Sequence, residues 1–251
     1  ITTGTSTGSG SFSTTFTVDS QPWGTTTIIV TCINSGERAT STFTIIPNIL
    51  VSPVIGTVGS LVTVVGSGFD ASTGIRIAFG TTQTITQCTT NRDGTFTIIW
   101  TVDTQYYGSK TVKAIQFNDE SKLAQKEFKI LVHVVEVTPT QGTVGSSIVV
   151  NGDGFGNNET IRIIFGVGKT VTTPASSVGT FSVSFVVNTQ PYGTKTINVE
   201  GTTHHEEDNR KIFFILGNIT EVQPQSGPVG IRVTLSGNGF DISEGVRIDF
   251  G

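Results

Sequence analysis

Apolar and polar residues alternate over short segments along the whole chain. In segment 95–102 the apolar side chains are Phe96, Ile98, Trp100 and Val102, one at every second position. This spacing is typical of a β-strand with one buried face. No segment shows helical periodicity over a useful length, and Gly and Thr are abundant. The pattern predicts an all-β protein, because branched side chains suit strands and Gly suits turns.

Four motifs recur along the chain about 85 residues apart, which indicates tandem repeats. They are Gly-x-Gly-Phe at 66–69, 152–155 and 237–240; a strand ending in Phe-Gly at 75–80, 161–166 and 246–251; Gly-x-Phe at 10–12, 94–96 and 179–181; and Val-Asp/Asn-x-Gln-x-aromatic-Gly at 18–24, 102–108 and 187–193. The phase of the motifs divides the chain into a C-terminal half repeat (1–47), two complete repeats (48–133 and 134–218) and an N-terminal half repeat (219–251). We expect the two half repeats to look incomplete or to pair with something else.

Each complete repeat is predicted to contain seven strands, placed in the first of them near 49–53, 60–66, 74–79, 83–89, 95–102, 110–117 and 126–132. Seven short antiparallel strands in such a length indicate an immunoglobulin-like (Ig-like) β-sandwich. In the half repeats we expect one strand with Phe12, Phe16 and Val18 on its buried face and another across 246–250. The junctions have almost no spare Gly or Ser, so we expect the sandwiches to form a rod.

The start of each repeat resembles the IPT/TIG group of Ig-like domains. A proline (Pro53, Pro139, Pro224) precedes Gly-x-x-Gly, an apolar strand, Gly-x-Gly-Phe and a strand closing on Phe-Gly. The resemblance covers about the first 30 residues of each repeat. It implies tandem Ig-like domains similar to those of large prokaryotic cell-surface proteins, including S-layer proteins and adhesin stalks. The family also includes DNA-binding transcription factors.

The charge of the chain argues against nucleic acid as a partner. The 251 residues carry 15 Lys plus Arg against 19 Asp plus Glu, a net charge of −4. Only 14% of residues are charged, compared with about 25% in average proteins, and no basic stripe is present to neutralise phosphates. The apolar runs are too short to span a membrane. Two cysteines, Cys32 and Cys88, are predicted to be free thiols.

Calcium is the candidate metal. Asp70 and Asp241 follow the Gly-x-Gly-Phe turn, and Glu244 lies close behind Asp241. Oxygen ligands at these positions could bind Ca²⁺ near a domain junction, and the alternative is ordinary turn chemistry in which Asp bonds its own backbone. The cluster His204–Asp208 could also hold a metal, although a solvated loop is the favoured explanation.

Other candidate sites concern sugars. The aromatic residue before Gly in the long motif (Trp23, Tyr107, Tyr192) is either a sugar-stacking platform or a corner residue that holds the turn into the sixth strand. Asn158 and Asn218 lie in N-x-[ST] sequons and are possible glycosylation sites. The dense Thr residues offer further positions for O-linked sugar, or simply cover the solvent faces of strands.

No catalytic arrangement is visible, so we expect no enzyme activity and no catalytic residue. The sequence predicts a structural, extracellular segment of a cell-surface protein that associates with copies of itself in an S-layer-like or matrix-type coat, with calcium as the candidate cofactor. The alternatives are an adhesin stalk, an Ig-like module that binds glycan or protein, and spacer domains of a secreted enzyme.

Overall fold

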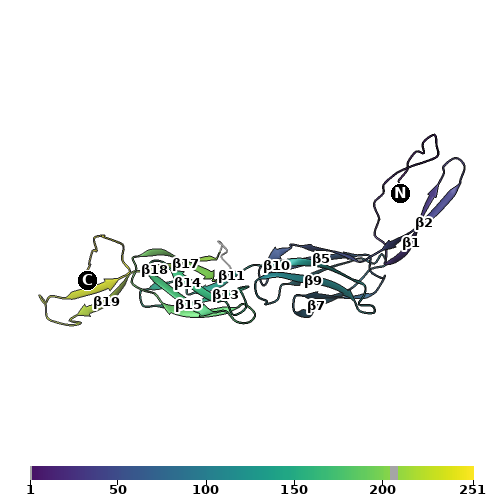
Figure 1. The fold of residues 1–251 in the computed structure, drawn as a ribbon. Coiled ribbons are helices and arrows are strands. Elements are labelled where there is room, and N and C mark those ends of the chain that lie inside the picture. The colour runs from purple at the N-terminus through teal and green to yellow at the C-terminus, as the bar shows by residue number, and fades with distance from the viewer. Residues whose placement is uncertain (1, 204–208) are drawn as a thin grey trace. The chain divides into compact units, whose positions relative to one another are not determined.

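The computed structural model describes residues 2–203 and 209–251, and these contain strands and turns but no helix (Figure 1). The prediction of an all-β protein is therefore confirmed. Contacts between residues divide the chain into two compact units. The first comprises Ile1–Pro53, Val62–Trp100 and Thr111–Glu127, and the second comprises Val54–Leu61, Thr101–Lys110 and Phe128–Gly251.

The first unit contains a hairpin and most of two further sheets. Strands β1 (Gly24–Thr31) and β2 (Arg38–Ile45) form the antiparallel hairpin, in purple in Figure 1. A three-stranded sheet has the order β3 (Asn48–Ser52), β5 (Leu61–Ser67), β8 (Phe96–Thr101). A five-stranded sheet has the order β4 (Ile55–Gly56), β10 (Leu123–Ile130), β9 (Gly108–Gln116), β6 (Gly74–Phe79), β7 (Thr82–Thr89).

The second unit repeats this arrangement. Its three-stranded sheet has the order β11 (His133–Thr138), β13 (Ser147–Asp153), β16 (Phe181–Val186). The five-stranded sheet has the order β12 (Gln141–Thr143), β18 (Arg210–Leu216), β17 (Gly193–Gly201), β14 (Thr160–Phe165), β15 (Lys169–Pro174). The strands β19 (Asn218–Gln223) and β20 (Thr234–Asn238) form a separate antiparallel pair.

The strand count differs from the expected seven. Among the described residues, 48–133 and 134–218 each contain eight strands. The additional ones, β4 and β12, pair in parallel with β10 and β18. Proline cannot donate a hydrogen bond to a ladder, so β3 and β11 end just before Pro53 and Pro139. The chain then crosses to the other sheet, where a short run pairs with the last strand.

The core follows from the alternation. Phe79 and Trp100 are buried with their ring centroids 4.8 Å apart, and Phe69 lies 5.6 Å from Phe96. In the second unit Phe155 and Phe181 meet edge to face at 5.2 Å. In each pair one ring comes from the Gly-x-Gly-Phe turn or the strand that ends in Phe-Gly, and the other comes from β8 or β16 of a three-stranded sheet. The aromatic residues therefore fill the space between the two sheets of each sandwich.

Two expected strands are absent, and these predictions were wrong. Residues 11–18 form no strand, and Phe12, Phe16 and Val18 are exposed. Segment 246–250 also lacks strand structure, with Phe250 exposed. The strands equivalent to segment 11–18 are β8, which pairs with β5, and β16, which pairs with β13. The strands equivalent to segment 246–250 are β6, which pairs with β7 and β9, and β14, which pairs with β15 and β17. Segments 1–47 and 219–251 contain no counterparts of those partners, so an isolated strand there would leave its backbone groups unpaired.

Candidate functional site

Each aromatic loop meets the Gly-x-Gly-Phe turn that follows it in the chain. The backbone N–H of the aromatic residue donates to the carbonyl oxygen of the motif phenylalanine. The three bonds run from Trp23 to Phe69 (2.9 Å), from Tyr107 to Phe155 (3.0 Å) and from Tyr192 to Phe240 (3.1 Å). The first bond lies within the first unit and the other two lie within the second. The same loop-to-turn contact is therefore built three times, and we call it the joint.

Glycines make this close approach possible. At Gly154 the backbone φ is +68°, and a Cβ there would overlap the carbonyl oxygen of Leu131 in the segment between β10 and β11. A Cβ at Gly179 would overlap the carbonyl oxygen of Phe155. Gly68, Gly239 and Gly94 face equivalent carbonyl groups. These motif glycines are required because only a residue without a side chain fits against the neighbouring backbone in this conformation.

A buried glutamine shapes each loop in the described complete repeats. The Gln190 side chain donates from Nε2 to Asn188 Oδ1 (2.7 Å) and accepts at Oε1 from the Val167 backbone N–H (2.9 Å). Gln105 donates in the same way to Asp103 Oδ1 (2.9 Å). Buried amides are stable when both ends are bonded. The Asp/Asn-x-Gln part of the motif thus holds the loop in the shape that presents the aromatic residue.

The aromatic residues sit directly before the sixth long strand, as the corner interpretation expects, and lysines lie over two of the three rings. Lys122 Nζ lies 3.7 Å from the ring centroid of Trp23, and Lys129 Nζ lies 5.1 Å from that of Tyr107. Tyr192 packs edge to face on Phe214 at 5.1 Å. A cation over a ring face is attracted by the ring electrons. A sugar stacking on Trp23 from that side would have to displace the lysine.

Asp70 is bonded to a lysine and an amide. Its Oδ2 accepts from Lys122 Nζ at 2.7 Å and from Gln116 Nε2 at 2.8 Å. The hydrogen bond from Lys122 is the main cause that lowers the pKa of the Asp70 carboxyl below its usual value, with Gln116 adding to it against the cost of burial. Calcium binding at Asp70 would have to displace the ammonium group of Lys122.

The other proposed calcium ligands are exposed. Asp241 Oδ1 accepts from the Ile242 backbone N–H at 2.8 Å, which is ordinary turn chemistry, and Glu244 lies in the same exposed segment. Within the described part of the chain no group of three His, Cys, Asp or Glu side chains is placed to hold a metal. The cluster His204–Asp208 lies outside the described residues. Calcium binding stays a prediction.

The two sequons differ in their surroundings. Asn158 is exposed in the turn before β14, at a φ of +54°, and its Nδ2 donates to Asn157 Oδ1 at 2.6 Å. Asn218 is half-buried at the start of β19, opposite Asn238. A glycan needs space around the amide, so Asn158 is the more accessible of the two. Cys32 and Cys88 are both free, and burial raises the pKa of the Cys88 thiol.

The pair His133 and Asp153 is among the polar pairs that the sequence patterns missed. His133 and Asp153 stand opposite each other on β11 and β13, with His133 Nδ1 3.6 Å from Asp153 Oδ1. Both atoms are buried without a hydrogen-bond partner. Burial raises the pKa of the Asp153 carboxyl, and the charge of His133 acts in the opposite direction. No motif marks the pair, because only strand pairing brings the two residues together.

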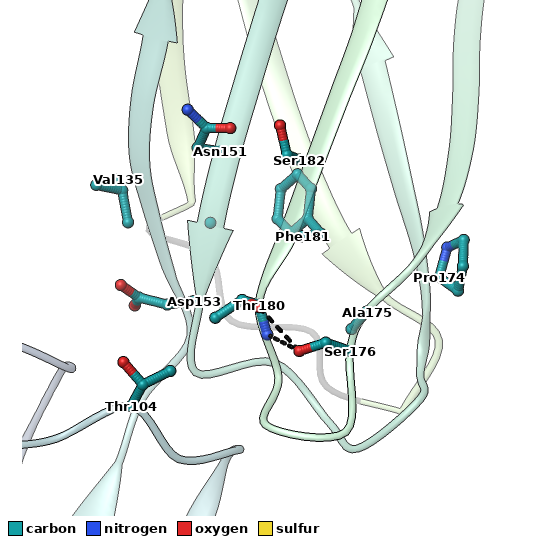
Figure 2. A pocket seen from close by; sticks show the side chains of 11 residues that line it. Thr104, Val135, Asn151, Asp153, Pro174, Ala175, Ser176, Thr180, Phe181 and Ser182 are labelled. Atoms are coloured by element: carbon teal, nitrogen blue, oxygen red, sulfur yellow. Dashed lines mark hydrogen bonds between the residues drawn. The ribbon is translucent and has the colours of Figure 1, made fainter.

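Asp153 also borders a shallow groove of about 590 Å³, which is lined by residues of β13, the start of β16 and segment 174–180 (Figure 2). Most of its lining surface is apolar, and polar side chains such as Asn151, Ser182 and Thr104 supply the smaller part. In Figure 2 a hydrogen bond of 2.8 Å joins the hydroxyl groups of Ser176 and Thr180 at its lower end. The groove therefore offers hydroxyl, amide and carboxylate groups to a small polar ligand.

No family model matches the chain, and no curated protein matches it either. The resemblance to IPT/TIG domains stays a prediction. The described residues hold no helix with the length and apolar character of a membrane span.

Several solved structures are weakly similar to the chain. Invasin, a bacterial integrin-binding protein, is 14% identical with a TM-score of 0.33 over 70% of this chain, which spans only 42% of the invasin chain. A tetra-tandem repeat from the extending region of a large adhesion protein is 14% identical with a TM-score of 0.31, covering 96% of this chain and 79% of that one. The Bacteroides ovatus protein SGBP-B, in complex with a mixed-linkage heptasaccharide, is 16% identical with a TM-score of 0.32, covering 88% and 63%. Values this low assign neither a family nor a function to the chain.

Proposed function

We propose that this chain is a structural segment of an extracellular cell-surface protein, whose tandem Ig-like repeats 48–133 and 134–218 hold a fixed spacing within an S-layer-like or matrix-type coat. The observation that carries the proposal is the joint. It occurs three times with the same backbone hydrogen bond, between Trp23 and Phe69, Tyr107 and Phe155, and Tyr192 and Phe240. A contact repeated in this way suits an array in which each repeat meets the next in one geometry.

Short connections support the same proposal. Between β10 and β11 only Leu131 and Val132 intervene, and between β18 and β19 only Gly217. The glycines of the joint face the carbonyl oxygens of Leu131 and Leu216, so the connecting backbone is in contact with the turn. Linkers behave as flexible coils when they are longer and rich in Gly and Ser. A stiff succession of sandwiches is the expected result.

The surface chemistry favours a coat over an isolated stalk. Only 14% of residues are charged, and strands such as β2 and β7 present mainly Thr, Ser and Gln side chains. Fewer charged groups lose their hydration when two such surfaces meet. An adhesin stalk would use the same joint, and in that case the binding function would belong to other residues of the protein.

The groove beside Asp153 favours one second candidate, a glycan-binding module. Its hydroxyl, amide and carboxylate groups match the hydrogen bonds that a sugar can make. A soluble oligosaccharide titrated into 15N-labelled protein would shift the amide resonances of Asn151 and Asp153 if the groove binds it. Resonances that stay in place at millimolar sugar would exclude this role for the groove.

Electron microscopy of the native protein tests the main proposal, first with calcium and then with a chelator. Ordered sheets are expected, and sheets that dissolve in chelator would establish a calcium-dependent coat. Substitutions Asp70→Asn and Asp241→Asn would then identify the ligands. Isolated rods under both conditions would contradict the coat and leave the stalk.

A further inference from the structure

The outer face of sheet β3–β5–β8 carries an apolar patch, which we define as Leu50, Val65 and Ile99. Their exposed fractions are 64%, 41% and 60%. Leu50 stands directly opposite Val65 in the antiparallel ladder, and β8, which carries Ile99, is the next strand beyond β5. Because alternate residues of a strand share a face, these three side chains form one surface that points into solvent.

The fold does not require apolar side chains at these positions. The equivalent residues in sheet β11–β13–β16 are Glu136, which stands opposite Asn151, and Ser184. In the β19–β20 pair the equivalent of the Leu50–Val65 pair is Glu221 opposite Ser236. The same ladder position is thus polar in the two later copies and apolar in one. The patch is a property of the repeat 48–133 and not of its architecture.

The remainder of this outer face is uncharged. The residues around the patch are Asn48, Ser52, Leu61, Thr63, Ser67, Thr97 and Thr101, of which Leu61 is a further exposed apolar residue. In contrast, the corresponding face of β11–β13–β16 includes His133, Glu136 and Asp153. A surface that covers the patch would therefore remove no ionised side chain of this face from water. The loss of hydration of charged groups is the main cost of burying a polar surface.

We propose that the patch is the contact between copies of this chain, in which the face of one copy packs on the same face of a second copy around a two-fold axis. Two copies of this uncharged apolar face can pack together without burying a charged group. If the patch packed instead on one of the two equivalent faces of the chain, Glu136 or Glu221 would lie against apolar residues of the patch such as Leu50. A self-complementary surface of this kind generates an isologous pair, with the two sheets about 10 Å apart.

The size of the face sets the strength of the contact. Three strands about 4.8 Å apart, each about five residues long, present about 250 Å². Stable complexes bury about 800 Å² per partner. A single contact is therefore weak and forms at high protein concentration, and a coat held together by further contacts would supply that concentration locally. The inference deepens the proposed coat and rests on it, because the coat supplies the array.

The test replaces the patch by the residues that the repeat 134–218 carries at the same positions. The triple variant Leu50→Glu, Val65→Asn, Ile99→Ser should fold, since Glu136, Asn151 and Ser184 occupy the same sites in an equivalent sheet. Sedimentation equilibrium of the 251-residue chain is measured from micromolar to millimolar concentration. We expect the average mass of the wild type to rise with concentration, and the triple variant to need at least a tenfold higher concentration for the same rise.

Two controls complete the experiment. Val167→Glu removes a largely exposed apolar side chain (81%) and adds a charge away from the patch, so it should associate like the wild type. The reciprocal variant Glu136→Leu, Asn151→Val, Ser184→Ile should gain a second contact and form species larger than dimers. Circular dichroism and thermal melting establish that each variant is folded.

Failure of this inference and failure of the coat are distinguishable. Equal association of the wild type and the triple variant overturns the patch as the contact. A wild type that stays monomeric at millimolar concentration also overturns the patch, even if microscopy of the native protein shows a sheet. Isolated rods in microscopy, together with association that the triple variant abolishes, refute the coat and leave the patch as a dimer contact.

Discussion

The carboxylate of Glu159 occupies the space that a side chain on Gly201 would need. A Cβ on Gly201 would overlap Glu159 Oε1. Glu159 is buried, and it accepts hydrogen bonds from the Gly156 N–H (2.7 Å) and from both the N–H and the hydroxyl of Thr203 (2.6 Å each). The carboxylate therefore links the turn before β14 to the residues that follow β17, its neighbour in the five-stranded sheet.

In the repeat 48–133 the space that corresponds to the one filled by Glu159 is filled by a side chain from the strand and not from the turn. The equivalent of Gly201 is Gln116, a buried residue of β9 that bonds both the N–H and the carboxylate of Asp70. The equivalent of Glu159 is Thr73. One repeat thus uses a long side chain from the strand, and the next uses a long side chain from the turn. The two solutions exclude each other.

This exchange predicts strong coupling between the two positions. Gly201→Gln alone should destabilise the protein by about 2–3 kcal/mol, because the Glu159 carboxylate would lose its buried hydrogen bonds. Adding Glu159→Thr should restore part of the loss, since the pair then matches Gln116 and Thr73. Urea unfolding of the four members of the cycle measures the coupling free energy. Strictly additive effects would contradict the shared site.

The joint predicts that Gly154 tolerates no side chain. Gly154→Ala should cost more than the strain of a left-handed residue, which is about 1–2 kcal/mol, because the new Cβ would also overlap the Leu131 carbonyl oxygen. Gly145→Ala is the matched control, with a φ of +88° and nothing within 4 Å of the new Cβ. Thermal melting of both variants separates strain from overlap. Equal losses would show that the close approach at the joint carries no energetic weight.

The Asp70–Lys122 pair predicts a loss of stability in acid. The pKa of Asp70 is lowered in the folded protein, mainly by the hydrogen bond from Lys122. A lowered pKa contributes stability above the ordinary value of 3.8, and this is lost as the pH falls through the folded value. Urea midpoints of the wild type should fall more steeply below pH 4 than those of Asp70→Asn. Parallel curves for the two proteins would refute the assignment.

Asp153 should change the stability of the protein with pH in the direction opposite to Asp70. Burial raises its pKa, so its contribution to stability is present below the ordinary value of 3.8 and is lost as the pH rises through the folded value. Asp153→Ser, which introduces the equivalent residue Ser67, should stabilise the protein at pH 7 by about 1 kcal/mol because a buried unpaired oxygen is removed. The gain should disappear below about pH 4.

A reciprocal substitution checks the same relationship. Ser67→Asp places a carboxylate on the equivalent position of β5, opposite Asn48. Its neutral-pH stability should be lower than that of the wild type, and acid should narrow the difference. If Asp153→Ser instead destabilises the protein at pH 7, the interaction with His133 outweighs the cost of burying the carboxylate.

The strand positions were predictable wherever a strand has one buried face. The alternation around Phe96 and Trp100 predicted β8, and the equivalent pattern predicted β16. The short strands β4 and β12 were missed, since two or three residues carry no period. The patterns at 11–18 and 246–250 were misleading for a different reason. Alternation describes which face a strand would bury, but a strand also needs a neighbour to bond.

The candidate sites were located only in part. The motifs identified the aromatic loop and the Gly-x-Gly-Phe turn as separate features, and the backbone bond from Tyr107 to Phe155 joins them across 48 positions of sequence. The proposed ligand Asp70 follows the Gly-x-Gly-Phe turn, and its partner Lys122 belongs to another loop. The pair His133 and Asp153 had no signal in the sequence.

By itself the sequence determined the all-β class, the period of about 85 residues and the equivalence of positions between repeats, because these follow from local alternation and from recurring motifs. The tertiary structure alone decided which residues meet: the carbonyl oxygen that faces Gly154, the lysine that bonds Asp70, and the exposure of Leu50, Val65 and Ile99 on one face. The physical reason is that contacts depend on strand pairing and on close approach between segments distant in the chain, and neither leaves a periodic trace in the residues themselves.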